Sequence, residues 1–312
     1  MVYKVSVFGA GNVGAEVARR IVEKKLADVV LVDIVEGIPQ GKALDILQSG
    51  PIEGFDSKII GTNDPSIIKG SDIVVVTAGL ARKPGMSRDD LQAANANIVK
   101  GIVENIKKYA PDSIIIMVTN PLDVMTYLAY KVSGFDKKRV FGMAGELDTA
   151  RMITFISEAT DVPPSKIEAV VLGGHGDLMV SVVSKTKVNG KPISQVLSKD
   201  KIESIVKRTA NGGAEIVNLL KTGSAYYAPS ASAVKMVESV IKDQGKVIPS
   251  AVILDGEYGL KDVVIGVPAK IGKNGIEKVI DIKLTDEERS MLFKSAQSVK
   301  ESINKLKWNR DV

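Results

Sequence analysis

Residues 5–14 read VSVFGAGNVG, and this stretch decides the fold of the 312-residue chain. A short apolar run typical of a buried strand leads into a glycine-rich loop, and a segment with helical periodicity follows the loop. Glycines at this spacing allow a tight turn and let backbone N–H groups reach a pyrophosphate at the positive end of the helix. We therefore expect a dinucleotide to bind at this loop, through Gly9, Ala10, Gly11, Asn12, Val13 and Gly14.

An acidic residue ends the second predicted strand. Asp33 lies 19 positions after Gly14, close to the separation at which a carboxylate accepts hydrogen bonds from the adenosine ribose in dinucleotide-binding folds. The same carboxylate would repel a 2′-phosphate, which favours NAD over NADP as the cofactor. A simple turn residue at the end of a strand is the alternative interpretation.

Strands and helices alternate over residues 1–145. Hydrophobic periodicity predicts strands at residues 3–8, 29–33, 58–60, 73–77, 113–118 and 139–141, with helices at 13–25, 37–48, 89–109 and 122–132. Such alternation implies parallel strands joined by right-handed crossovers. The sequence thus predicts an α/β fold whose residues 1–145 form an NAD-binding Rossmann domain with a doubly wound parallel sheet.

The pattern changes in residues 146–312, which we expect to form an α+β substrate domain in tight contact with the first. Predicted helices cover residues 147–159, 201–220, 230–243 and 286–305, and predicted strands cover 169–172, 179–183, 247–254, 263–270 and 276–279. Asn189-Gly190 predicts a hairpin turn. Gly212-Gly213 inside a helix costs roughly 1 kcal/mol per glycine, which close packing against another backbone, such as a partner subunit, or a simple kink would explain.

Composition excludes several classes of chemistry. The chain has no cysteine and one histidine, which rules out thiolate nucleophiles and sites with several Cys or His ligands, so we expect no metal. The net charge is +5, but basic residues are scattered beside acidic ones, so we expect anionic ligands rather than nucleic acid. We expect no membrane partner and a cytoplasmic location, because apolar runs are short and the N-terminal residues lack a leader pattern.

His175, the single histidine, lies in the sequence LGGHGD at residues 172–177. Imidazole exchanges protons near neutral pH, and the surrounding glycines leave space for another molecule. A surface or satisfied core histidine is the alternative. Asp148 and Arg151 are three apart on a predicted helix and share a face. They could form an ordinary surface ion pair, or Asp148 could orient His175 while Arg151 binds a substrate carboxylate.

Two further segments offer groups for an anionic ligand. The loop ARKPGMSRDD at residues 81–90 carries Arg82 and, at the start of a predicted helix, Arg88. A loop with two guanidinium groups could close over an anion, and a solvated basic loop is the alternative. Thr119-Asn120-Pro121 ends an apolar strand, which places an amide where doubly wound sheets bind ligands.

Together these motifs resemble the lactate/malate dehydrogenase family, and within it the lactate-dehydrogenase-like malate enzymes of bacteria and archaea. The resemblance runs from residue 5 to about 305 and preserves five motifs in order. It implies that His175 is the catalytic acid/base, paired with Asp148, and that Arg151 binds the carboxylate beside the reacting carbon. It also implies that Arg88 polarises the C2 oxygen and that Asn120 holds substrate and nicotinamide. The expected cofactor contacts include Asn95, Thr119 and Asn120.

Arg82 indicates the substrate. Lactate enzymes of the family carry glutamine at this position and malate enzymes carry arginine, and a second substrate carboxylate needs its own cation. Ala225 falls where lactate enzymes have a bulkier threonine. The resemblance therefore implies reversible oxidation of (S)-malate, a small dicarboxylate, to oxaloacetate with NAD⁺, in a homodimer or homotetramer. A lactate or other 2-hydroxyacid dehydrogenase and a non-catalytic NAD-binding protein are the alternatives.

Overall fold

The structure is a computed structural model that describes residues 2–80 and 88–306. The N-terminal half contributes six strands and four helices to it. They are β1 (Lys4–Phe8), α1 (Asn12–Glu23), β2 (Asp28–Val32), α2 (Ile38–Glu53), β3 (Ile59–Thr62), β4 (Ile73–Val76), α3 (Arg88–Tyr109), β5 (Ile114–Met117), α4 (Leu122–Ser133) and β6 (Val140–Met143). All six strands pair in parallel in the order β3-β2-β1-β4-β5-β6. The predicted doubly wound sheet is confirmed.

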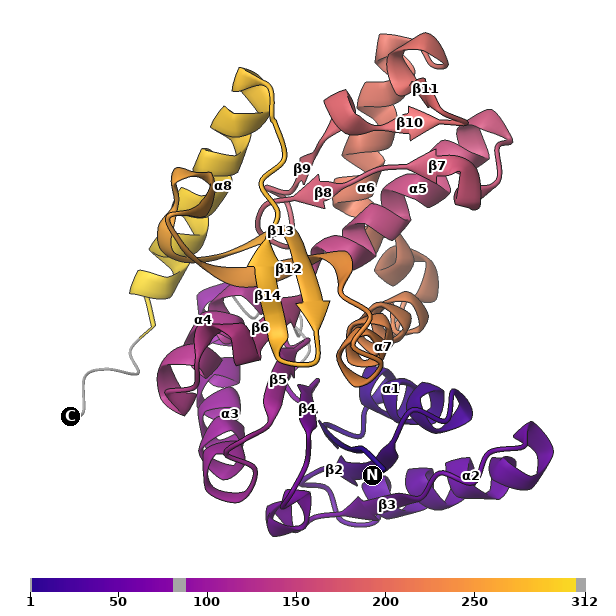
Figure 1. The fold of residues 1–312 in the computed structure, drawn as a ribbon, viewed down its shortest axis with the longest axis vertical. Coiled ribbons are helices and arrows are strands. Elements are labelled where there is room, and N and C mark those ends of the chain that lie inside the picture. Colours follow the sequence, from indigo (N-terminus) through magenta and orange to yellow (C-terminus); the bar gives the residue numbers. More distant parts are fainter. Residues whose placement is uncertain (1, 81–87, 307–312) are drawn as a thin grey trace.

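Helices cover both faces of this sheet. Figure 1 shows α3 and α4 on one side and α1 and α2 on the other. Every residue of β4 and β5 is buried. Parallel strands with helices on both faces of the sheet are expected to be apolar at every position.

The second half of the chain contributes eight strands and four helices within the described residues. They are α5 (Gly145–Thr160), β7 (Ile167–Glu168), β8 (Val171–Leu172), β9 (Val180–Ser181), β10 (Lys187–Val188), β11 (Lys191–Pro192), α6 (Lys199–Leu220), α7 (Tyr227–Ile241), β12 (Lys246–Asp255), β13 (Lys261–Gly272), β14 (Gly275–Val279) and α8 (Asp286–Asn304). Asn189 and Gly190 both have positive φ, so the predicted hairpin turn between β10 and β11 is confirmed.

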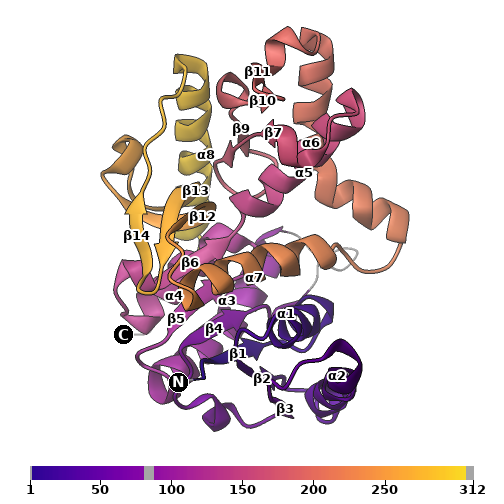
Figure 2. The ribbon, with the colours of Figure 1, turned by 45° about the vertical axis from the view of Figure 1, so that its right-hand side comes forward.

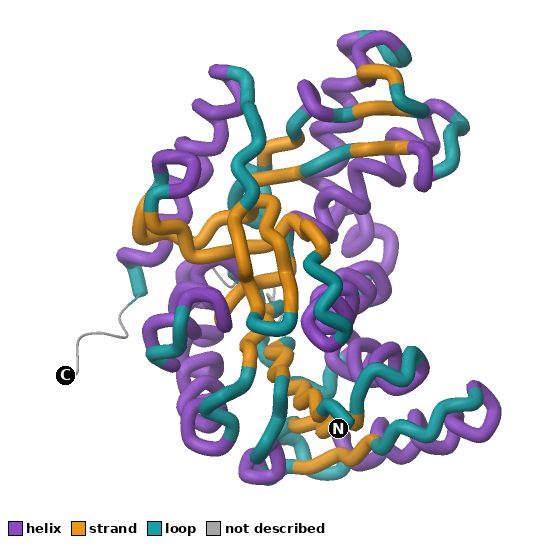
Figure 3. Tube along the Cα trace, in the orientation of Figure 1, coloured by secondary structure: helices purple, strands orange, loops and turns teal. Residues whose placement is uncertain are grey.

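Three of these later strands extend the N-terminal sheet. β12 pairs antiparallel with β6, where Ser250 faces Met143 and Ala251 faces Gly142, and β13 and β14 follow outward. The result is one mixed sheet of nine strands among the described residues. The remaining short strands pack with α5 and α6 around a second apolar cluster (Figures 1 and 3), and α7 lies along α1 (Figure 2).

Several predicted boundaries are wrong for identifiable reasons. The strand expected at 169–172 is shortened to β8, which pairs with β9. The preceding β7 lies outside the predicted range and pairs with β10 instead. The strand expected at 179–183 shortens to β9, which is followed by a helical turn at Val183–Lys185. α2 continues through Pro51, beyond the predicted end at residue 48. α7 begins at Tyr227, three residues early, because Pro229 is tolerated in a first turn.

Candidate active site

The glycine loop between β1 and α1 is shaped for close approach. Gly9 has φ +99°, and a Cβ there would lie 2.7 Å from the backbone nitrogen of Ala78, so only glycine fits. A Cβ on Gly14 would lie 1.8 Å from the Gly9 carbonyl oxygen. Gly11 borders open space, and α1 has neither a side-chain cap nor an acidic residue in its first turn. The uncapped N–H groups at this helix end fit a pyrophosphate.

Asp33, which follows β2, holds the glycine loop through hydrogen bonds to the backbone. Its Oδ2 accepts the Ala10 N–H at 2.6 Å and its Oδ1 accepts the Val35 N–H at 3.0 Å. From α2, the Lys42 ammonium donates to the Ala10 carbonyl oxygen at 2.7 Å. The contact between Asp33 and a ribose stays a prediction. This contact of Lys42 with the loop could not be predicted from the sequence, since a lysine on a helix carries no signal of a partner 32 residues away.

Asn95 and Thr119 organise the carboxyl ends of β4 and β5. The Asn95 amide accepts the Leu80 N–H at 2.7 Å and donates to the Asn120 carbonyl oxygen at 2.7 Å. The buried Thr119 hydroxyl donates to the Ala78 carbonyl oxygen at 2.7 Å. This geometry gives both side chains a positioning role, and direct contact of either with the cofactor stays a prediction.

The His175 loop is anchored by three separate elements. Gly173 forms a bridge with Gly266 of β13. The Gly174 N–H donates to the Ser295 hydroxyl of α8 at 2.8 Å, and the His175 N–H donates to Asp123 Oδ2 of α4 at 2.8 Å. The loop is therefore fixed although β8, which leads into it, has only two residues.

The helix α5 brings Asp148 and Arg151 to His175. The ring Nδ1 of His175 lies 2.8 Å from Asp148 Oδ2, and Arg151 Nη1 donates to Asp148 Oδ1 at 3.0 Å. The Asp148 side chain is 2% exposed, whereas those of Arg151 and His175 are 13% and 16% exposed. Because a carboxylate only accepts, Nδ1 carries the proton in this pair and Nε2 is left for another molecule. The interpretation of Asp148 and Arg151 as a plain surface ion pair is wrong.

Burial and neighbouring charges act in opposite directions on the histidine. Burial lowers the pKa of His175, but the charge of Asp148, its hydrogen bond to the ring and the charge of Asp123 outweigh burial and raise the pKa above its usual value. Burial also raises the pKa of Asp123, to about 6. The charges of the site thus stabilise the protonated imidazole.

The glycine pair in α6 makes room for Arg151. A Cβ on Gly212 would lie 3.0 Å from Arg151 Cδ, and a Cβ on Gly213 would lie 3.4 Å from Nη2. Within the chain, these glycines meet the arginine side chain. They let the guanidinium lie against the helix. Contact with a partner subunit and a kink both stay predictions.

A cavity of about 490 Å³ opens beside the histidine. His175, Asn120, Asp123 and Gly174 line it, together with residues of α3 and α8. Arg82 lies outside the described residues, and of Arg88 only the backbone at the start of α3 is described. The structure therefore brings His175, Asp148, Arg151 and Asn120 together and leaves the loop arginines untested.

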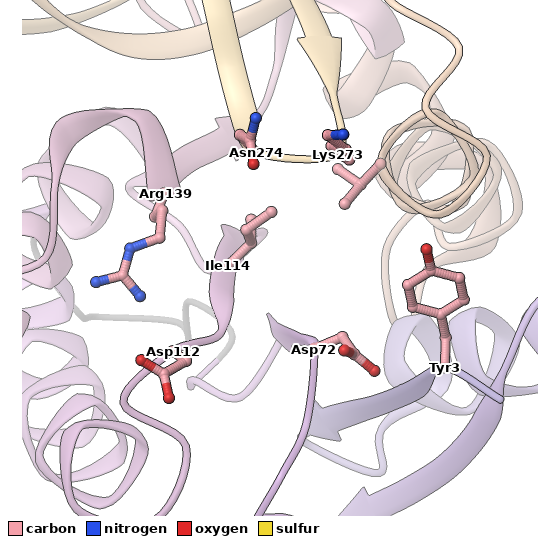
Figure 4. Close-up of a pocket in the computed structure, with 8 residues that line it drawn as sticks. Tyr3, Asp72, Asp112, Ile114, Arg139, Lys273 and Asn274 are labelled. Carbon is pink, nitrogen blue, oxygen red and sulfur yellow. The ribbon is translucent and has the colours of Figure 1, made fainter. Parts of the chain in front are cut away.

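A second hollow lies at the opposite edge of the sheet (Figure 4). Tyr3, Asp72, Asp112 and Arg139, which precede β1, β4, β5 and β6, line it. These are the amino ends of parallel strands, whereas ligands of doubly wound folds bind beyond the carboxyl ends. The Arg139 guanidinium also donates to the backbone carbonyl oxygens of Pro111 and Ser113, so this side chain stabilises the loop before β5.

Comparison with known proteins identifies the family. The model of the lactate/malate dehydrogenase NAD binding domain matches residues 3–142, and that of the alpha/beta C-terminal domain matches residues 145–309. A malate dehydrogenase of Pelodictyon phaeoclathratiforme is 56% identical over 97% of this chain and 98% of its own length.

Solved structures of malate and lactate dehydrogenases share the fold over nearly the whole chain. Malate dehydrogenase of Cryptosporidium parvum gives a TM-score of 0.96 at 43% identity and covers 98% of this chain and 99% of its own. Lactate dehydrogenase of that organism, complexed with lactic acid and β-nicotinamide adenine dinucleotide, gives 0.95 at 43% identity and covers 97% and 98%. Both substrate types thus occur on this fold. The chain belongs to the lactate/malate dehydrogenase family.

Proposed function

We propose that the protein is an NAD-dependent malate dehydrogenase, an enzyme that interconverts (S)-malate and oxaloacetate. The observation that carries this proposal is the buried Asp148 carboxylate, which bonds His175 with one oxygen and Arg151 with the other beside a cavity. An acid/base and a carboxylate-binding cation are thus held together, as oxidation of a 2-hydroxyacid requires. The relatives named malate dehydrogenase support the substrate.

In this mechanism His175 moves the proton. When malate is oxidised, the Nε2 of neutral His175 takes the proton of the C2 hydroxyl, and Asp148 stabilises the imidazolium that results. NAD⁺ supplies the acceptor for the hydride that leaves C2. In the reverse direction the protonated ring returns the proton to the C2 oxygen, and the raised pKa of His175 keeps the ring charged for this step.

Positive groups hold the substrate. Arg151 uses one guanidinium nitrogen on Asp148, which leaves further donors for the carboxylate beside the reacting carbon. We assign the second carboxylate to Arg82, polarisation of the C2 oxygen to Arg88, and contact with substrate and nicotinamide to Asn120.

The cofactor lies along the carboxyl ends of the parallel strands in this proposal. Its pyrophosphate meets the N–H groups that begin α1, and its adenosine ribose meets Asp33. We also propose a division of the chain after residue 145, where β6 ends and α5 begins. The later strands that join the shared sheet then belong to the second, substrate-binding unit.

One steady-state experiment tests substrate and cofactor together. Oxaloacetate and pyruvate are each assayed with NADH and with NADPH, and we expect oxaloacetate with NADH to give the highest kcat/KM. Arg82→Gln should lower kcat/KM for oxaloacetate by about 10- to 10²-fold, because a carboxylate loses a charged partner of about 1.5–3 kcal/mol in a closed site. Preference for pyruvate in the unsubstituted protein would instead support the lactate alternative, and turnover of neither acid would support the non-catalytic one.

We further propose that the protein is a homodimer or homotetramer. Large apolar side chains are exposed on α2, where Ile52 is 86% and Leu44 is 55% exposed, and such patches mark contact surfaces. Sedimentation velocity should show an oligomer that Leu44→Lys with Ile52→Lys dissociates and Val247→Lys, exposed on β12, does not. A monomer in the unsubstituted protein would contradict the proposal.

A cytoplasmic location also stays a proposal, supported by the compatibility of the sequence with a reducing compartment.

Within the described residues, no helix combines the length and the apolar character that crossing a membrane requires.

A further inference from the structure

Asp123 is a buried carboxylate that anchors the His175 loop and has no part in the mechanism proposed above. It lies in the first turn of α4, two residues after Pro121, and is 5% exposed. Its Oδ2 accepts the His175 N–H at 2.8 Å, whereas its buried Oδ1 has no hydrogen-bond partner among the described residues. Its side chain also borders the cavity beside the histidine.

We propose that Asp123 is a positioning residue whose Oδ2 fixes the His175 loop and whose negative charge stabilises the protonated imidazole. This inference rests on the proposed function, since it makes Asp123 act through His175. Asp123 and Asp148 are thus two carboxylates that contact the same histidine. Asp148 bonds the ring, and Asp123 bonds the backbone.

Anchoring alone does not explain a carboxylate at this position. A backbone N–H needs one acceptor, and an amide or hydroxyl oxygen supplies it without the cost of a buried charge. Asp123 accepts one hydrogen bond from the loop and keeps a second oxygen without a partner in the described structure. An incompletely satisfied buried carboxylate is costly, which indicates that its charge has a use.

The charges around His175 show what that use is. From α5 the ring faces Asp148 and Arg151, and because Arg151 is paired with the same carboxylate, its positive charge offsets part of that of Asp148. From α4 it faces Asp123, which adds a second negative charge. The other charged residues that line the cavity are Asp177 of the same loop, Asp89 of α3, and Glu301 and Lys305 of α8.

The directions in which the pKa values of His175 and Asp123 shift agree with this arrangement of charges. Burial lowers the pKa of His175, the Asp148 charge and hydrogen bond raise it, and the Asp123 charge raises it further. Burial raises the pKa of Asp123 to about 6 although the His175 N–H and the His175 charge act in the opposite direction. Asp123 is thus ionised above about pH 6, in the range where reduction of oxaloacetate needs a protonated ring.

Asp123→Asn tests the proposal, because the amide keeps an acceptor for the His175 N–H and removes only the charge. In the profile of kcat/KM for oxaloacetate with NADH, the pKa above which activity falls should move down by about half a unit to one unit. NADH affinity and Tm should stay close to those of the unsubstituted enzyme. Glu301→Gln is the matched control, since it removes an exposed carboxylate of the same cavity and should not move the profile.

The single histidine permits a direct measurement as well. In untagged protein labelled at the histidine ring carbon, NMR should show the imidazole titration with a second inflection near pH 6, and Asp123→Asn should lose that inflection and lower the ring pKa. If Asp123→Asn does not fold, Asp123→Ser serves, because its hydroxyl also accepts.

Equal ring pKa values with and without the Asp123 charge would overturn the proposal while leaving the proposed function intact. Failure of the unsubstituted protein to reduce oxaloacetate would overturn the proposed function, and the ring titration would still decide the role of Asp123.

Discussion

His175→Asn is expected to lower kcat for oxaloacetate reduction by about 10³- to 10⁴-fold, the loss typical of a missing general acid. Asparagine is close to the ring in size and its amide N–H can still donate to Asp148, so the loop held by Asp123 and Ser295 should keep its shape. NADH binding, followed by fluorescence titration, should therefore change by less than about threefold. Stopped-flow measurement of NADH oxidation gives the rate of the chemical step.

The outcome is unambiguous because the chain contains one histidine. No other imidazole can account for activity that titrates near neutral pH. A variant that binds NADH normally and retains a quarter or more of the unsubstituted kcat would disprove the assignment of His175 as the acid/base. Asn189→His, in the exposed hairpin turn, is a useful control, since it adds an imidazole far from Asp148 and should leave the pH profile unchanged.

Asp148→Asn should have the second largest effect, a loss of about 10³- to 10⁴-fold in kcat, by analogy with the orienting aspartate of hydrolase triads. The amide can donate to the ring Nδ1, which would move the ring proton to Nε2 and leave the wrong tautomer facing malate. It also removes the negative charge that Arg151 bonds at 3.0 Å. We therefore expect KM for oxaloacetate to change as well as kcat.

The pH dependence of Asp148→Asn has a definite sign. Asp148 raises the pKa of His175 through its charge and its hydrogen bond, so the substitution lowers this pKa and the protonated form needed for reduction is lost at a lower pH. Reduction should fall off earlier as the pH rises. Glu146→Gln is the control, because Glu146 lies in the same turn but pairs with Lys235. An unchanged kcat in Asp148→Asn would contradict the mechanism.

The parts of this structure that follow from local pattern are the ones the sequence predicts well. The glycine loop, the strands around it and Asp33 depend on residues close together in the chain, and the parallel sheet follows from strand and helix alternation. The split of residues 167–172 into β7 and β8 does not follow in that way. It depends on which distant strand each half pairs with.

The residues of the candidate site also differ in how far the sequence alone predicts them. Asp148, Arg151 and His175 could be proposed as partners because their residue types suit one chemistry. The fold then brings Asp148 and His175, 27 positions apart in the sequence, into contact. Asp123 could not, since an acidic residue in the first turn of a helix is ordinary helix chemistry. The role of Gly212 was likewise hidden, because only the packed structure shows Arg151 against it.

The antiparallel pairing of β12 with β6 has a consequence for how the chain holds together. If the chain ended at Met143, β6 would present a row of unpaired N–H and C=O groups, and such edges are templates for aggregation. β12, β13 and β14 therefore cover the edge of the Rossmann sheet that β6 would otherwise expose. Because β12 pairs along its whole length with β13 and with β6 at two positions, most of its pairing lies within the β12–β13 hairpin rather than with the Rossmann sheet.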